Sequence, residues 1–290
     1  MNINRKYKDR LFRMLFGTEE NKDNILSLYN ALHGTDYNDA DAIELRTIED
    51  AIYIGMKNDV SFLIGNELSL WEQQSTYNPN MPLRGFIYYG KLYDAYVSEL
   101  KTSMYGTVLL QLPVPNYVVL FNGSTDCPAV EKMRLSDAFM GGSDSGEYEW
   151  TATVYNLNGD KNRRLLEACK PLADYSEVVR RINSRIRKGM TKEEVIEAVD
   201  EAVRSCIEDG ILSEFLTRHR AEVIDVCITE FDEKKYVDSI REEGRAEGLL
   251  IGKVKVLTDM VADGIITLDE AAGRADMTIE DFTEYLKKHN

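Results

Sequence analysis

The segment KNDVSFLIGNELSLWEQQ, residues 57–74, decides the fold. Two runs of strand-forming residues flank Gly65-Asn66, a pair that tolerates the positive φ angles of tight hairpin turns. A turn centred on this pair places Asp59 directly opposite Glu72 on the neighbouring strand. The segment therefore predicts a β-hairpin that presents two carboxylates on one face, with their Cβ atoms about 4.5–5.5 Å apart.

Two carboxylates this close repel each other unless a cation lies between them or one of them is protonated. Because side chains alternate along a strand, Lys57 shares the face of Asp59, and Gln74 shares the face of Glu72. Hard carboxylate oxygens with open coordination positions suit Mg²⁺ or Mn²⁺ with a phosphate substrate. A neighbouring ammonium would stabilise the nucleophile or the developing charge. The hairpin therefore predicts a metal-dependent phosphodiesterase site.

The residues around the hairpin predict an α/β (α+β) fold. Apolar residues at helical spacing indicate amphipathic helices over 5–16 and 20–33, and a third helix over 82–104. Phe62 and Trp71 point away from the carboxylates and are expected in the core. We interpret 124–149 as a surface excursion. The predicted strands are 51–56, 59–64, 68–74, 115–123 and 150–158.

Residues 161–232 predict a helical layer or lid packed on a core formed by 1–160. The expected helices cover 161–172, 175–188, 191–209 and 211–231. Thr191 and Glu194 form a predicted capping box. Gly189 and Gly210 are expected to stop helices.

Residues 233–290 predict a separate tail. Gly244, Gly248 and Gly252 line one face of a 240–256 helix, which indicates either self-association into a homo-oligomer or a frayed linker. Two short helices follow, with predicted caps at Thr267 with Glu270 and at Thr278 with Asp281. They resemble a helix-turn-helix, but the acidic start of the second favours a packing or partner module over DNA readout.

The composition and charge of the chain limit the classes of function it can have. The chain has 290 residues and a net charge of −15, which argues against nucleic-acid binding by the chain as a whole. Two basic stretches, 5–13 and 161–188, leave open either a local basic groove or solvated helix faces. No segment predicts a membrane span or signal peptide, so we expect a cytoplasmic protein. Four widely separated cysteines predict reduced, buried thiols.

The hairpin and its surroundings resemble the PD-(D/E)XK nuclease family transposases and recombination-promoting nucleases of bacteria. The resemblance rests on the blocks NDVSF, WEQQSTYNPNMPLR and PVPNYVVLFNG, and continues over nearly the whole chain. It implies a restriction-endonuclease-like fold, a mixed sheet flanked by helices and followed by a helical C-terminal region. It also implies Mg²⁺-dependent cleavage of DNA. The residues that carry it are Asp59, Glu72, Gln74, Pro82, Arg84, Tyr88 and Tyr89.

Several residues receive roles on this interpretation. Asp59 and Glu72 are the expected metal ligands, joined by the carbonyl of Gln73. Gln74 replaces the lysine of the broad nuclease pattern, and we expect Lys57 to supply the missing charge from the facing strand. Lys57 or Gln74 would orient the attacking water.

Three other residues have open assignments. Arg84 and Tyr88 lie one helical turn apart and either bind a phosphate or form an acid-paired arginine beside a core tyrosine. Asp9 resembles the early acidic position of the family and either reaches the metal or is a solvated charge.

Two classes of function therefore remain. The leading interpretation is a Mg²⁺-dependent DNA endonuclease linked to recombination or transposition. A transposase that joins strands would differ only in the fate of the DNA ends. The alternative is a catalytically silent nuclease-like domain that serves assembly or regulation, which the net charge and the missing lysine favour.

Overall fold

The computed structural model divides into two compact units, Met1–Glu230 and Phe231–Asn290, which are described separately. The predicted strand at 51–56 lies outside the described residues, and so do Lys57 and Asp59. Gly244, Gly248 and Gly252 lie outside them as well. The described residues are 6–46, 60–100, 104–141, 147–187, 189–228, 253–258, 260–261, 263–275, 277–278 and 282.

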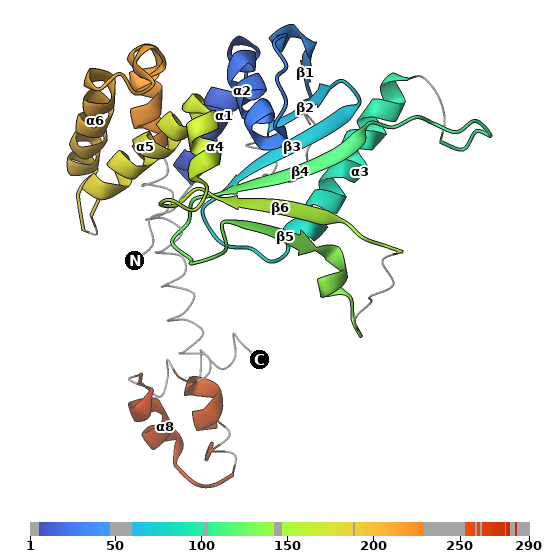
Figure 1. Ribbon diagram of the computed structural model, residues 1–290. Coiled ribbons are helices and arrows are strands. Elements are labelled where there is room, and N and C mark those ends of the chain that lie inside the picture. The colour runs from blue at the N-terminus through green and yellow to red at the C-terminus, as the bar shows by residue number, and fades with distance from the viewer. Residues whose placement is uncertain are drawn as a thin grey trace. The chain divides into compact units, whose positions relative to one another are not determined.

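The first unit is an α/β fold built on a mixed sheet, which has six strands among the described residues (Figure 1). Their order across the sheet is β1-β2-β3-β4-β6-β5. β1, β2 and β3 are antiparallel, β3, β4 and β6 are parallel, and β5 runs antiparallel to β6. The strands are β1 (Ile43–Leu45), β2 (Val60–Ile64), β3 (Glu67–Gln74), β4 (Val114–Phe121), β5 (Val130–Arg134) and β6 (Thr151–Asn156).

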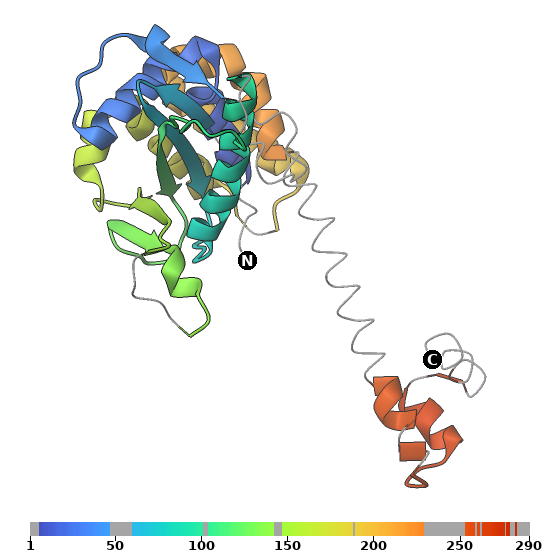
Figure 2. The same cartoon turned by 90° about the vertical axis from the view of Figure 1, so that its right-hand side faces the viewer.

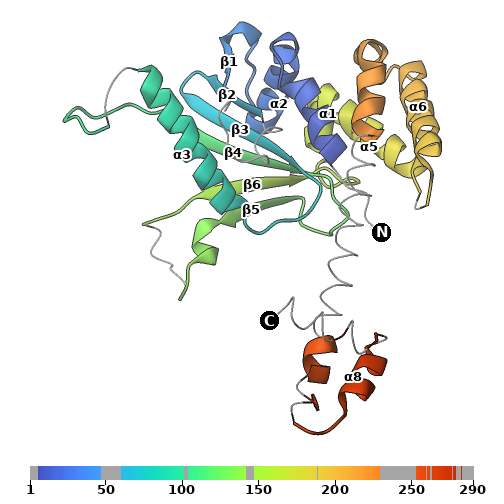
Figure 3. The same cartoon turned by 180° about the vertical axis from the view of Figure 1, so that it is seen from behind.

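Helices cover both faces of this sheet. α3 lies along one face, and α1 and α2 lie on the other (Figures 2 and 3). α5 packs against α1, α2 and α6. A further helix begins at 213, and its described part runs to 228. The helices of this unit are α1 (Lys6–Phe16), α2 (Lys22–His33), α3 (Met81–Glu99), α4 (Arg163–Ala168), α5 (Lys170–Arg185) and α6 (Lys192–Glu208).

The predicted hairpin is present in the register that its turn requires. Val60 pairs with Trp71, and the pairing continues without a bulge to Ile64 with Glu67. Gly65 has φ +55°, which fits the first central position of a II′ turn. On the α1 and α2 face, Phe62 and Trp71 are fully buried, with ring centroids 4.7 Å apart. Their predicted place in the core is confirmed.

Two sequence predictions about this unit are wrong. The segment 124–149 was expected to be a surface excursion, but it contains the edge strand β5. Met133 is the only buried residue of that strand, so the strand lacks a repeating apolar face that a sequence pattern could show. The single helix expected over 161–172 is two helices that meet at Cys169. The break comes just before Pro171, because proline is favoured in the first turn of a helix and unfavourable in its interior.

The second unit contains α8 (Leu268–Arg274). Its predicted capping box is present, with Thr267 and Glu270 bonding each other's backbone N–H groups. The other predicted cap, at Thr278 with Asp281, involves Asp281, which lies outside the described residues. A small apolar core consists of Val254, Leu257, Ala271, Ala272, Ala275 and Phe282. The tail is therefore packed on its own apolar residues.

Two predictions about the chain as a whole can also be compared with the structure. The four cysteines are buried and form no disulfide, as predicted. Within the described ranges, no helix has the length and apolar character needed to cross a membrane.

Candidate functional site

Glu72 is the centre of the candidate site. It lies near the carboxyl end of β3 on the face that α3 covers, and only 1% of it is exposed. Three elements surround its carboxylate. Arg84 of α3 forms an ion pair with Oε1, and the Gln74 amide of β3 donates to the same oxygen. The Tyr117 hydroxyl of β4 donates to Oε2. Both carboxylate oxygens are therefore hydrogen-bonded.

Strand register and a glycine together position Tyr117. In the parallel pairing of β3 with β4, Tyr117 lies beside Leu70, and its side chain projects on the same face as Glu72. The Tyr117 ring packs directly against the backbone of α3 at Gly85. A Cβ atom at Gly85 would overlap this ring and would lie 3.0 Å from the indole nitrogen of Trp150. A side chain at position 85 would thus push Tyr117 away from Glu72.

Arg84 and Tyr88 are close to each other on α3, as their spacing predicts. The Tyr88 hydroxyl accepts hydrogen bonds from Arg84 Nη2 at 3.0 Å and Nε at 3.3 Å. Tyr88 is buried, whereas the Arg84 side chain is 28% exposed. The structure therefore contains the acid-paired arginine and the core tyrosine, with part of the guanidinium still facing solvent.

Burial and pairing act in opposite directions on this cluster. Burial raises the pKa of Glu72 above its ordinary value, although the charge of Arg84 and the hydrogen bonds from Tyr117 and Gln74 oppose this shift. For Arg84, burial is the largest single influence and lowers the pKa, but the charge of Glu72 and the contacts with Tyr88 and Tyr117 together outweigh it, so the net pKa is raised. On balance, the charged form is thus disfavoured for Glu72 but not for Arg84. The reason is solvent access, since the Arg84 side chain stays partly exposed and Glu72 does not.

Gln73 belongs to the opposite face of the sheet. Its Nε2 donates to Asn122 Oδ1 at 2.8 Å, and its buried Oε1 has no hydrogen-bond partner among the described residues. Lys8 of α1 is 4% exposed and donates to the same Asn122 Oδ1 at 3.1 Å. The carboxyl end of β3 thus has a second group of buried polar residues, on the sheet face opposite the Glu72 cluster.

Asp9 lies beside Lys8 on α1 and is partly exposed. Burial raises the pKa of Tyr175 well above its ordinary value, and the nearby charge of Asp9 raises it further. Tyr175 donates to the Lys8 carbonyl oxygen at 3.1 Å. The described contacts therefore place Asp9 by Tyr175 of α5.

Sequence reasoning missed Tyr117, Lys8 and Asn122. The signal for Lys8 was available, because it lies one turn before Phe12 on the apolar side of its predicted helix. Tyr117 had no such signal. The register between parallel strands joined through a helix does not follow from a turn, so its position beside Glu72 could not be derived.

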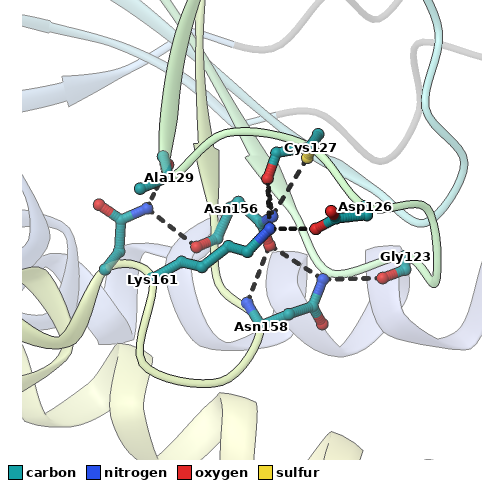
Figure 4. Close-up of polar contacts among 8 residues, drawn as sticks. Gly123, Asp126, Cys127, Ala129, Asn156, Asn158 and Lys161 are labelled. Atoms are coloured by element: carbon teal, nitrogen blue, oxygen red, sulfur yellow. Dashed lines mark hydrogen bonds and ion pairs between the residues drawn. The ribbon is translucent and has the colours of Figure 1, made fainter.

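The carboxyl ends of β3, β4 and β6 meet at one edge, where a polar network holds the loops together (Figure 4). Lys161 donates to Asp126 and to the Cys127 carbonyl. Asn156 Nδ2 donates to the same carbonyl at 2.9 Å. Asn158 donates to the Gly123 carbonyl at 2.7 Å. These contacts join the loop after β4 to the loop after β6, so they are structural.

The second basic stretch is largely neutralised along its own helices. Arg163 pairs with Glu167, and Lys170 pairs with Asp174. Arg180 and Arg181 both pair with Glu177. This pattern favours solvated helix faces over a basic groove in these helices.

The donor chemistry of the Glu72 cluster suits a hard cation, because it offers carboxylate and amide oxygens. A metal site also needs enough ligands. Across the parts of the chain that the structure describes, no group of three or more His, Cys, Asp or Glu residues could hold a metal ion. Glu72 is the only member of the predicted carboxylate pair among those residues. A complete metal site would therefore require Asp59.

Comparisons with known proteins do not identify a family. No protein-family model matches the chain. No curated protein and no solved structure matches it either.

Proposed function

We propose that the chain is a metal-dependent phosphodiesterase of PD-(D/E)XK type that cleaves DNA in the cytoplasm. The observation that carries this proposal is the register of β2 with β3. Asp59 directly precedes the first residue of the paired segment, Val60, whose partner Trp71 precedes Glu72. If the pairing continued by one residue, Asp59 would lie opposite Glu72 on the α3 face.

A buried ion pair such as Glu72–Arg84 often stabilises a fold no better than apolar side chains would, so its presence favours a functional role. In the proposal, Asp59, Glu72 and the Gln73 carbonyl hold Mg²⁺ or Mn²⁺. The bound cation would polarise a phosphoryl oxygen and activate water. Tyr117 and Gln74 orient the Glu72 carboxylate by hydrogen bonds.

Other side chains would position the DNA and the water. Arg84 lies beside Glu72, and its solvent-facing part suits a bidentate contact with a DNA phosphate. Lys57 or Gln74 orients the attacking water, with Lys57 supplying the charge of the lysine that Gln74 replaces. Lys57→Ala with undiminished metal-dependent cleavage would remove its assigned role.

Cleavage of supercoiled plasmid tests the proposal. The wild type is expected to nick the plasmid with Mg²⁺ or Mn²⁺, whereas Asp59→Asn and Glu72→Gln are expected to lose this activity. Glu67→Gln is the matched control, because Glu67 is on the same strand but faces the α2 side, where it bonds Asn116 and Ser69. Equal nicking by all four proteins would reveal contamination and count against the proposal.

A second candidate function has its own support. The Glu72 carboxylate is already neutralised by Arg84, and the chain carries a net charge of −15. Both observations favour a catalytically silent nuclease-like domain that serves assembly or regulation. Thermal unfolding distinguishes the two candidates, since a cation that binds the folded state raises its melting temperature. Mg²⁺ or Mn²⁺ should stabilise the wild type but not Asp59→Asn if the site binds metal. An equal response in both proteins would favour the silent domain.

A further inference from the structure

The amino ends of β4 and β6 separate and leave a fork in the sheet. Among the described residues, the two strands pair only from Val118 with Thr153 onward, although β4 begins at Val114 and β6 at Thr151. Figure 1 shows the strands diverging toward these ends. A hollow of about 370 Å³ lies in the fork, with walls from β4, β5 and β6. Pockets of roughly 300–1,000 Å³ hold small ligands, so this hollow has room for one.

Strand register places hydrogen-bond donors side by side along the fork. In the antiparallel pairing of β5 with β6, Lys132 lies opposite Thr153, and Arg134 lies opposite Thr151. Residues opposite each other have Cβ atoms about 4.5–5.5 Å apart. Ala152, between the two threonines, is buried in the core on the α3 side, so the threonines project on the other face. Figures 1 and 2 show no described helix across that face of β5 and β6.

Three side chains that line the hollow have donors without a partner. Among the residues that the structure describes, Lys132 forms no ion pair, and the hydroxyls of Thr151 and Thr153 form no hydrogen bond. Lys132 is exposed, and the two threonines are half-buried. Trp150 also lines the hollow, and its buried indole nitrogen has no partner in the same part of the chain. The lining therefore offers an ammonium, two hydroxyls and an indole N–H.

Glu149 is the one acidic residue among the described residues of the lining. Its carboxylate oxygens already accept hydrogen bonds from four donors. Arg134 Nε donates to Oε2 at 2.8 Å, and so does the Ser136 hydroxyl. The backbone N–H groups of Ser136 and Trp150 donate to Oε1 at 3.2 Å and 3.1 Å. Because Arg134 balances the charge of Glu149, the positive charge of Lys132 remains uncompensated within the described lining.

From these observations we infer that the fork between β4 and β6 is an oxyanion site that binds a phosphate group. A phosphate group has negative charge and several acceptor oxygens, which match an ammonium beside hydroxyl and N–H donors. The ammonium repels a cation, and an apolar ligand would leave the donors unpaired. The group belongs either to free phosphate or to the phosphodiester backbone of DNA. The site is distinct from the Glu72 carboxylate, and the inference does not depend on the proposed cleavage.

Titration of the full chain with inorganic phosphate, followed by NMR, tests the inference. The chain has two tryptophans, Trp71 and Trp150, and so gives two indole N–H signals, which a Trp150→Phe chain assigns. The titration is run at constant ionic strength with EDTA, so that no cation at Glu72 recruits the phosphate. We expect the Trp150 signal to move saturably. The Trp71 signal should stay in place, because Trp71 is fully buried in the core and does not line the hollow.

Substitutions in the hollow measure what each donor contributes. Lys132→Met should weaken phosphate binding at least about tenfold, because a hydrogen bond between charged groups is lost. Thr151→Val keeps the branched shape that suits a strand and should weaken binding about threefold. Lys170→Met is the matched control, since it removes the same charge from an exposed lysine that pairs with Asp174 of α5. Its affinity for phosphate should equal that of the wild type.

The possible results separate the inference from its alternatives. A Trp150 signal that phosphate does not move, or that sodium chloride moves equally, would overturn the inference. Unchanged affinity in Lys132→Met would overturn it as well, because the phosphate would then lie elsewhere, such as at Arg84.

A DNA oligonucleotide of mixed sequence distinguishes the two sources of the phosphate group. Oligonucleotide binding that Lys132→Met weakens would support the site and identify the DNA backbone as its ligand. Phosphate binding that requires Lys132, without any oligonucleotide binding that requires it, would support the site and identify free phosphate.

Discussion

Two glutamate–arginine pairs in this chain differ in almost every physical respect. Glu72 of β3 is 1% exposed and pairs with Arg84 across to α3. Glu177 is 27% exposed and pairs with Arg180 and Arg181 within the single helix α5. Burial raises the pKa of Glu72, whereas hydrogen bonds from the two arginines lower the pKa of Glu177 to about 2.

The difference shows that surroundings, and not the chemical pair, decide what an ion pair does. A surface pair contributes little because water already solvates both charges. A buried pair holds its charges at a large desolvation penalty, so it depends on every hydrogen bond around it. The Glu177 pairs neutralise a basic helix, and the Glu72 pair keeps a carboxylate inside a polar cluster. The following experiments measure this contrast.

Removal of one arginine should give the largest effect. Arg84→Ala leaves the Glu72 carboxylate buried without its cation, so we expect a loss of about 3–5 kcal/mol in the free energy of unfolding. Arg180→Ala is the control and should lose no more than about 1 kcal/mol. Urea denaturation at neutral pH measures both. Similar losses would mean that solvent reaches Glu72 freely.

Loss of one hydroxyl should rank second. Tyr117→Phe removes the donor to Glu72 Oε2 while keeping the ring, so we expect destabilisation by about 1.5–3 kcal/mol, as for a hydrogen bond to a charged group. Tyr148→Phe, at a side chain that is 78% exposed, is the control and should be neutral. Equal stability of Tyr117→Phe and wild type would contradict the hydrogen bond.

The pH dependence of the buried pair should follow from the raised pKa of Glu72. A carboxyl group whose pKa is higher in the folded state than in the unfolded state stabilises the fold at pH values below its ordinary pKa. This contribution is lost as the pH rises through the pKa of the folded state. The stability of the wild type relative to Glu72→Gln should therefore fall as pH rises above about 4.5. Paired urea titrations between pH 4 and 7 check the sign; a rising difference would show that pairing outweighs burial.

The surface pair should show the smallest effect and the opposite sign. The pKa of Glu177 is lowered from 4.5 to about 2, so its contribution is present above 4.5 and lost as pH falls toward 2. Glu177→Gln should lower stability at neutral pH by no more than about 1 kcal/mol. Added salt should reduce this difference. A salt-independent loss of several kcal/mol would instead indicate a packing role.

Local rules identified the parts of this fold that local chemistry controls. The turn at Gly65 set the register of β2 with β3, because a two-residue loop leaves only one pairing. Thr191 and Thr267 begin helices with complete capping boxes, as their spacing to glutamate predicts. The edge strand β5 was missed, because its residues have no repeating apolar face.

The sequence alone determined that Glu72 lies on the face of β3 opposite Trp71, since strand periodicity depends only on the backbone. It also determined that Arg84 and Tyr88 would meet, since they are one helical turn apart. Only the tertiary structure decided that Arg84 and Tyr117 both bind Glu72. These contacts join three elements whose spacing depends on packing, including a glycine that lets a tyrosine ring lie against a helix. Contacts between distant segments depend on how whole surfaces pack against each other, and a local sequence pattern does not determine that packing.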